Sequence, residues 1–255
     1  MPLMGKQPEL AVHMKEVRSK WLPKDKPSAI VVFSAHWESD PIKITSAAMP
    51  SMLFDYYGFP DAAYKYNYPA PGRSALAQRI QTLLASKGIE SQLDNERGFD
   101  HGVFIPLMLM YPEADIPVVC VSLHSSLSPS TNMDAGKALA SLRYENILFV
   151  GSGYTFHNMD VFRSSPSDSK TARQASGTFN AWLKQAITGG NRIDSLEQWE
   201  RAPGARVCHP REEHLLPLLV VAALGGNSAD AKVIFDHTGT DRFGQGIAVS
   251  SYLFD

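Results

Sequence analysis

The chain has little cysteine, no long hydrophobic run and almost no net charge. Cys120 and Cys208 are its only cysteines, so no disulfide framework can form and a reducing cytoplasm is the expected location. A net charge of −2 gives no long-range attraction to nucleic acid or to an anionic membrane. The longest aliphatic stretch, 215–224, is about half of the ~20 residues that cross a bilayer, and Pro217 interrupts it. The first residues also lack the apolar core of a signal peptide.

What the sequence does contain is an alternation of strand-like and helix-like segments. The composition, 44% hydrophobic and 20% charged, is ordinary for a globular protein. Apolar, β-branched runs predict strands, and apolar residues at helical spacing predict helices between them. The stretch 47–71, rich in aromatics, Gly and Pro, predicts a long ordered loop of the kind that builds sites. The alternation favours one three-layer α/β domain, with strands at 29–33, 42–45, 116–123, 147–150, 232–235 and 247–252, and helices at 10–21, 73–86, 134–143, 171–187 and 210–224.

Four histidines lie at the ends of these apolar segments. His36 follows the strand at 29–33, and His157 follows the strand at 147–150 through a Gly-Ser-Gly turn. His101 precedes an apolar, helix-like run, and His214 falls in the first turns of the helix expected at 210–224. Ligands of open α/β sheets bind at the carboxyl ends of strands, and imidazole is the commonest protein ligand for transition metals. The pattern predicts one metal-centred active site assembled from distant segments.

Each histidine alone also has a structural explanation. His36 could bond to backbone at a strand end, and His157 could belong to a capped turn. Asp100 could cap a helix, or it could orient His101 as a general base. His214 either pairs with its acidic neighbours or binds a metal.

The other candidates carry weaker signals. His209 is a candidate for supporting the site from behind, and the adjacent Cys208 is a remote candidate for a metal ligand. His13 is expected to be structural, His124 to lie in a turn, and His237 to have at most an indirect role.

Six segments, taken together and in order, make the pattern specific. They resemble the class III extradiol ring-cleavage dioxygenases of the LigB-like superfamily, and most closely the 4,5-DOPA dioxygenase type. The resemblance runs from about residue 28 to the C-terminus. The segments are VVFSAHW at 31–37, FDYYGFP at 54–60, YPAPG at 68–72, RGFDHG at 97–102, GSG at 151–153 with His157-Asn158, and HPREEHLLPL at 209–218.

This resemblance implies a fold, a reaction and a set of site residues. The fold is a single three-layer α/β/α domain over residues 1–255 with a central mixed sheet. The reaction is O2-dependent cleavage of a small aromatic diol, a catechol of the DOPA type, to a semialdehyde. It implies one metal per chain, Fe(II) or Zn(II). His36 and His214 correspond to metal ligands, His157 lies at or next to the metal, and His101 and His157 are the acid/base candidates.

Tyrosines near these segments are candidates for the substrate pocket, because a phenol ring offers an apolar body and a polar tip. The candidates are Tyr154, Tyr57 and Tyr66, with Tyr56 beside them. A homo-oligomer is compatible with the sequence, and no nucleic-acid or membrane partner is expected.

One family feature is missing from the sequence. Members of the family open with a short strand ending in Ser-His-Gly, whose histidine binds the metal, and this chain contains no Ser-His-Gly. We therefore expect the first strand and one ligand to be absent, with weaker metal binding. Two other interpretations stay open at this point: a zinc-dependent hydrolase, and a non-catalytic metal-binding or interaction protein of the same fold.

Overall fold

The central sheet of the protein is mixed, as the resemblance implied. The computed structural model describes residues 8–163, 169–238 and 246–255. The strand order is β3-β2-β4-β1-β5; β1 runs parallel to β4 and β5, whereas β2 runs antiparallel to β4. Its strands are β1 (Ala29–Ser39), β2 (Ile42–Thr45), β3 (Ser91–Asp94), β4 (Val118–His124) and β5 (Ile147–Ser152).

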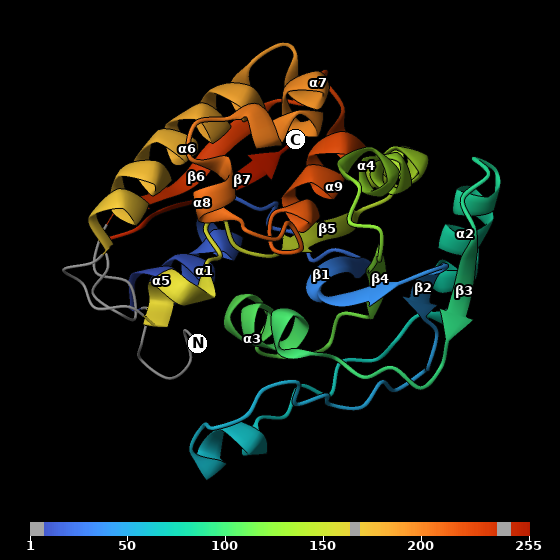
Figure 1. Cartoon of the computed structure of the whole chain (residues 1–255). Coiled ribbons are helices and arrows are strands. Elements are labelled where there is room, and N and C mark those ends of the chain that lie inside the picture. Colours follow the sequence, from blue (N-terminus) through green and yellow to red (C-terminus); the bar gives the residue numbers. More distant parts are fainter. Residues whose placement is uncertain (1–7, 164–168, 239–245) are drawn as a thin grey trace.

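Helices cover both faces of this sheet and complete the three layers (Figure 1). Strand β1 is apolar on both faces because it lies in the middle: Val31 and Phe33 pack into one core cluster, and Ile30 and Val32 into the other. The longer helices are α1 (Pro8–Lys20), α2 (Ser74–Ala85), α3 (His101–Met110), α4 (Pro129–Ala138), α6 (Lys170–Thr188) and α9 (Leu216–Gly225). The shorter ones are η2 (Asp61–Lys65), η3 (Ala140–Tyr144), α5 (Met159–Arg163), α7 (Arg192–Glu197), η5 (Trp199–Arg201) and α8 (Ala205–Cys208).

The last two strands form a separate antiparallel pair. Strands β6 (Ala231–Thr238) and β7 (Ala248–Phe254) pair only with each other in the described parts of the chain. Both strands were expected from the sequence. The structure shows that they form a second small sheet rather than an extension of the first.

Two predicted helices have different bounds in the structure. The helix expected at 210–224 begins at Leu216, because Pro217 has no N–H to bond to the carbonyl of Glu213 and fits only the first turn. His214 therefore lies in the turn before α9. The helix expected at 134–143 starts earlier, where the Ser128 hydroxyl accepts from the Thr131 N–H, and ends at Ala138 before η3.

Residues 47–71 form the long ordered loop that the sequence indicates. The loop contains η2 and an isolated bridge between Met52 and Phe99, and it extends from the body of the molecule beside α3 (Figure 1). Among the described helices, none has the length and apolar character needed to cross a membrane.

Candidate metal centre

The fold brings the four histidines into one cluster. The ring centroid of His36 lies 4.0 Å from that of His101 and 5.0 Å from that of His214. The centroids of His157 and His214 are 3.4 Å apart. Four segments far apart in the sequence, in β1, at the start of α3, after β5 and before α9, therefore converge at one place.

His36 lies on an irregular part of β1. The strand continues past the expected end at Phe33 to Ser39, but its pairing with β4 shifts register between Phe33 and Glu38, as at a bulge. Bulges re-aim side chains and are frequent beside active sites. The His36 N–H donates to the Ser34 hydroxyl at 3.2 Å, and the His36 carbonyl accepts from Arg97 at 3.1 Å, so the backbone here is held on both sides.

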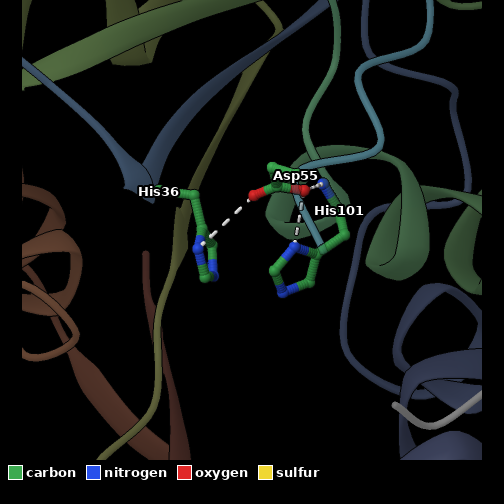
Figure 2. Close-up of side chains that lie close together, drawn as sticks. All are labelled: His36, Asp55 and His101. Atoms are coloured by element: carbon green, nitrogen blue, oxygen red, sulfur yellow. Dashed lines mark hydrogen bonds and ion pairs between the residues drawn. The ribbon is translucent and has the colours of Figure 1, made fainter. Parts of the chain in front are cut away.

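Asp55, from the long loop, links His36 and His101. One of its carboxylate oxygens lies 2.7 Å from Nδ1 of His101 and accepts the His101 backbone N–H at 3.0 Å. The other oxygen lies 3.5 Å from Nδ1 of His36 (Figure 2). Burial opposes ionisation of Asp55, but the hydrogen bonds from His101 outweigh it and leave its pKa below the ordinary value. Because an ionised carboxylate can only accept, the hydrogen bond between Asp55 and His101 requires a proton on Nδ1 of His101, which leaves its Nε2 for another partner. Nδ1 of His36 faces the same carboxylate at a longer distance.

Asp100 has neither of the two roles expected from the sequence, which were to cap a helix or to orient His101. It stands at the N-cap position of α3, but its side chain makes no capping bond and does not orient His101. Its carboxylate instead accepts from the Ser34 hydroxyl at 2.8 Å and from Arg97 at 3.1 Å, and burial raises its pKa. The aspartate that pairs with His101 is therefore Asp55, and Asp100 fixes the backbone under His36.

Glu213 links the other two histidines. Its Oε1 lies 2.8 Å from Nδ1 of His214 and 3.3 Å from Nδ1 of His157, and its Oε2 lies 3.4 Å from Arg211. Burial alone would raise the pKa of Glu213, but the hydrogen bonds from His157 and His214 hold it well below its usual range. The cluster thus contains two carboxylates, each facing Nδ1 of two rings.

Glycines let the turn after β5 approach the turn before α9. The Tyr154 N–H donates to the His214 carbonyl at 2.9 Å, and the His157 N–H donates to the Cys208 carbonyl at 2.9 Å. A Cβ on Gly153 would stand 2.2 Å from the His214 carbonyl oxygen, so only glycine permits this contact. The Gly-Ser-Gly motif therefore positions two of the four histidines.

The donor set suits a transition metal. Burial, followed by the nearby His101 and His214, lowers the pKa of His36 to about 3, and burial also lowers the pKa of His214. Both rings are therefore neutral at ordinary pH, which is the form that binds metal. A carboxylate on the Nδ1 side of a metal-binding histidine is the usual outer partner, since it fixes which nitrogen faces the ion.

Ring angles separate the histidines that can share an ion. A metal bound to an imidazole lies near the ring plane, along the lone pair of the nitrogen. The rings of His157 and His214 are stacked at an interplanar angle of 13°, so one ion cannot lie in both planes. The rings of His36 and His214 stand at 86° with centroids 5.0 Å apart. Two groups of described side chains have ligand atoms close enough together to hold an ion: His36 with Asp55 and His101, and His157 with Glu213 and His214.

The four tyrosine candidates lie in different surroundings. Tyr56 packs edge-on against His101, with ring centroids 5.6 Å apart, and its hydroxyl donates to the Ala63 carbonyl. Tyr57 is 89% exposed, Tyr66 packs on Phe104, and Tyr154 packs against the larger core. Substrate contact by Tyr57, Tyr66 or Tyr154 stays a prediction. The ring of Tyr56 contacts the cluster through His101.

The weaker candidates have local partners outside the cluster. His209 is fully buried with its ring against Phe179 and Trp199, and burial lowers its pKa to about 3. Burial raises the pKa of Cys208 to about 12, so it is a neutral thiol. His13 stacks on Phe235, and His237 lies on β6. His124 is the last residue of β4 rather than part of the expected turn, and its Nδ1 contacts the Ser126 hydroxyl in the turn that follows.

Comparison with known proteins identifies the family of this chain. Residues 4–249 match the family model described as the catalytic LigB subunit of aromatic ring-opening dioxygenase. The chain is 38% identical over 224 residues to 4,5-DOPA dioxygenase extradiol of Beta vulgaris, covering 86% of this chain and 82% of that protein. It is 40% identical over 203 residues to the Escherichia coli K12 protein of the same name, covering 77% and 72%. A crystal structure of an uncharacterized E. coli K12 protein superposes with a TM-score of 0.75 at 31% identity, covering 95% of this chain and 91% of that one.

Proposed function

The chain belongs to the LigB family of aromatic ring-opening dioxygenases, and from this premise we propose that it is a non-haem, metal-dependent extradiol dioxygenase. Its substrate would be a catechol of the DOPA type, which O2 opens beside the two hydroxyls to give a semialdehyde. The observation that supports this most is the cluster of four histidines whose Nδ1 atoms face two carboxylates, since it leaves four Nε2 atoms for a metal and a substrate.

We assign the metal to His36 and His214. Their rings are neutral and nearly perpendicular, and each has a carboxylate on its Nδ1 side. Bound Fe(II) would supply open positions for the diol and for O2, together with the redox chemistry that Zn(II) lacks. Iron is therefore the proposed metal, one per chain.

His101 is assigned as the base. Its Nε2 takes a proton from a substrate hydroxyl, while Asp55 accepts the Nδ1–H and stabilises the imidazolium that forms. The loop that carries Asp55 also carries Tyr56, so one segment both orients the base and packs against its ring. The aromatic side chains of Phe54, Tyr56 and Phe104 pack on one another on this side of His101.

His157 is assigned to proton transfer rather than to the metal. Its ring is stacked on the ring of His214, and because the two ring planes are nearly parallel, one ion cannot lie in both. Its Nδ1 faces Glu213, so its Nε2 is left to hold or return a proton during ring opening.

Aerobic turnover tests this function. The protein is loaded with Fe(II) without oxygen, mixed with L-DOPA or catechol, and then exposed to O2. We expect a yellow ring-opened product and O2 consumption equimolar with the diol, both lost in the His101→Gln variant. Turnover of an ester or amide with Zn(II) and no O2 uptake would identify a hydrolase. Bound iron with no turnover of any diol would identify a binding protein.

A cytoplasmic location and a homo-oligomer remain proposals from the sequence. Both cysteines are buried and unpaired, which fits a reducing compartment.

A further inference from the structure

An ion pair between two distant segments lies beside the metal centre. Both terminal nitrogens of the Arg211 guanidinium donate to the Glu38 carboxylate, at 2.7 and 2.6 Å. Glu38 lies on β1, two residues after His36, and Arg211 lies in the turn before α9, three residues before His214. The pair therefore joins the two segments that carry the proposed metal ligands, although 173 residues separate its partners in the sequence.

Glu38 and His36 lie on the same side of β1. Both are partly exposed, whereas Trp37 between them is buried. Because side chains alternate between the two faces of a strand, this pattern puts the ligand and the carboxylate on one face. The backbone here is itself held, since Arg97 donates to the His36 carbonyl at 3.1 Å and its guanidinium lies 5.0 Å above the Trp37 ring.

Arg211 also contacts the carboxylate that orients His214. Its Nη1 lies 3.4 Å from Oε2 of Glu213, while Oε1 of Glu213 faces Nδ1 of His214 and of His157. Within the described residues, Oε2 is buried and makes no hydrogen bond. A buried charged oxygen is costly without a compensating partner. The nearby guanidinium supplies the opposite charge, so each oxygen of Glu213 has its own partner.

The position of Arg211 depends on Glu38. The Arg211 side chain is 54% exposed, and a long side chain in water samples many rotamers unless a contact holds it. A bidentate contact between a guanidinium and a carboxylate fixes both the place and the plane of the guanidinium. Nη1 is the nitrogen that faces both Glu38 and Glu213, so the contact with Glu38 keeps it against Oε2 of Glu213.

We propose that Glu38 and Arg211 are positioning residues of the metal centre, a role that rests on the proposed assignment of the metal to His36 and His214. Glu38 holds the guanidinium of Arg211, Arg211 holds Oε2 of Glu213, and Glu213 orients the ring of His214. The strand that carries one ligand thereby fixes the orientation of the other. Outer partners of metal-bound histidines tune metal affinity, and this chain of contacts extends two side chains further out.

Three variants test this chain of contacts in the full protein. Fe(II) and Zn(II) affinities are measured without oxygen, by competition with a chelator, for Arg211→Gln, Glu38→Gln and the double variant. We expect Arg211→Gln to weaken binding of both metals by about tenfold, at the low end for an outer partner, and Glu38→Gln by about threefold because Arg211 remains. Since Glu38 acts through Arg211, the double variant should match Arg211→Gln rather than lose the product of the two, about thirtyfold.

Arg79 and Glu145 provide a matched control. They form the same two-pronged contact between α2 and the residue after η3, and their side chains are 50% and 37% exposed. Exposed ion pairs contribute little to stability. Urea unfolding of the metal-free protein should therefore change little in both Arg79→Gln and Arg211→Gln, whereas metal affinity should fall in Arg211→Gln and stay unchanged in Arg79→Gln.

Three results would overturn the proposal: unchanged affinity in Arg211→Gln, an equal loss in Arg79→Gln, or a double variant that loses the product of the single losses. None of these measurements depends on ring cleavage. A parent protein that binds iron without opening any diol would contradict the proposed function, and the expected pattern of affinities would still support the positioning role.

Discussion

The two halves of the metal centre use the same chemistry in different geometries. In one half Asp55 faces Nδ1 of His36 and His101, and in the other half Glu213 faces Nδ1 of His157 and His214. The first pair of rings is tilted at 48° with centroids 4.0 Å apart, whereas the second pair is stacked at 13° and 3.4 Å.

The difference shows that residue type does not fix a histidine's role. The carboxylates fix which nitrogen is free, and the angle between ring planes then decides which rings can share an ion. We therefore expect each half to supply one ligand and one proton-transfer group: His36 with His101, and His214 with His157. The predictions below test whether the halves differ in this way.

The largest expected effect is on turnover through His101. His101→Gln should lower kcat by roughly 10²–10⁴-fold, because it removes the base, and should leave the bound Fe(II) within a few-fold. Steady-state O2 uptake and metal analysis measure the two quantities. Loss of iron together with activity would instead make His101 a ligand.

Replacing each of the two carboxylates with an amide should affect metal affinity in one half of the centre and kcat in the other. Glu213→Gln should weaken Fe(II) binding by about 10–100-fold, since Glu213 supports His214 at 2.8 Å. Asp55→Asn should mainly lower kcat, because Asp55 is close to His101 at 2.7 Å and only 3.5 Å from His36. Competition with a chelator gives affinity, and O2 uptake gives kcat. The same effect on both quantities in both variants would contradict the comparison.

A smaller effect is expected from the tyrosines. Tyr56→Leu should raise KM or lower kcat several-fold, because the Tyr56 ring packs against His101. Tyr57→Leu is the matched control one residue away, and its 89% exposed ring predicts no change. A larger effect of Tyr57→Leu than of Tyr56→Leu would place the substrate elsewhere.

The last effect is on stability in acid and does not involve turnover. Burial lowers the pKa of His209 to about 3 in the folded protein, so the unfolded chain binds this proton first as the pH falls below about 6.5. The buried neutral ring therefore adds to the free energy of unfolding above pH 6.5. This contribution decreases as the pH falls from 6.5 toward 3, by at most about 1.4 kcal/mol per pH unit. His209→Phe should make urea unfolding less pH-dependent in this range, and His124→Gln serves as a control. An unchanged pH slope in His209→Phe would contradict the buried neutral ring.

Much of the fold follows from the sequence because its signals are local. The apolar runs at 29–33 and 147–150 indicate buried strands, and both are strands of the sheet. The helix predicted at 210–224 starts only at Leu216 in the structure. The prediction began too early because the residues before Pro217 also fit a helix start, whereas Pro217 itself fits only the first turn. The bulge at His36 has no local signal, since it depends on pairing with β4.

The candidate site could likewise be predicted only where its contacts are local in the sequence. Glu213 is adjacent to His214 in the sequence, so its proximity to that ring could be expected, although its contact with His157 could not. Asp55 lies 46 residues before His101, and no spacing rule connects a loop aspartate to a helix start. The nearby Asp100 was the natural local choice, and the packing of the long loop overrides it.

Metal binding by two single variants tests the central claim most directly. Fe(II) affinity is measured anaerobically for His214→Ala and His157→Ala, two rings whose centroids are 3.4 Å apart and which share Glu213. The ring-plane geometry predicts that His214→Ala loses more than about 100-fold in affinity, which is more than the loss of an outer partner causes, while His157→Ala stays within a few-fold of the parent. Equal losses in both variants, or a larger loss in His157→Ala, would contradict the account.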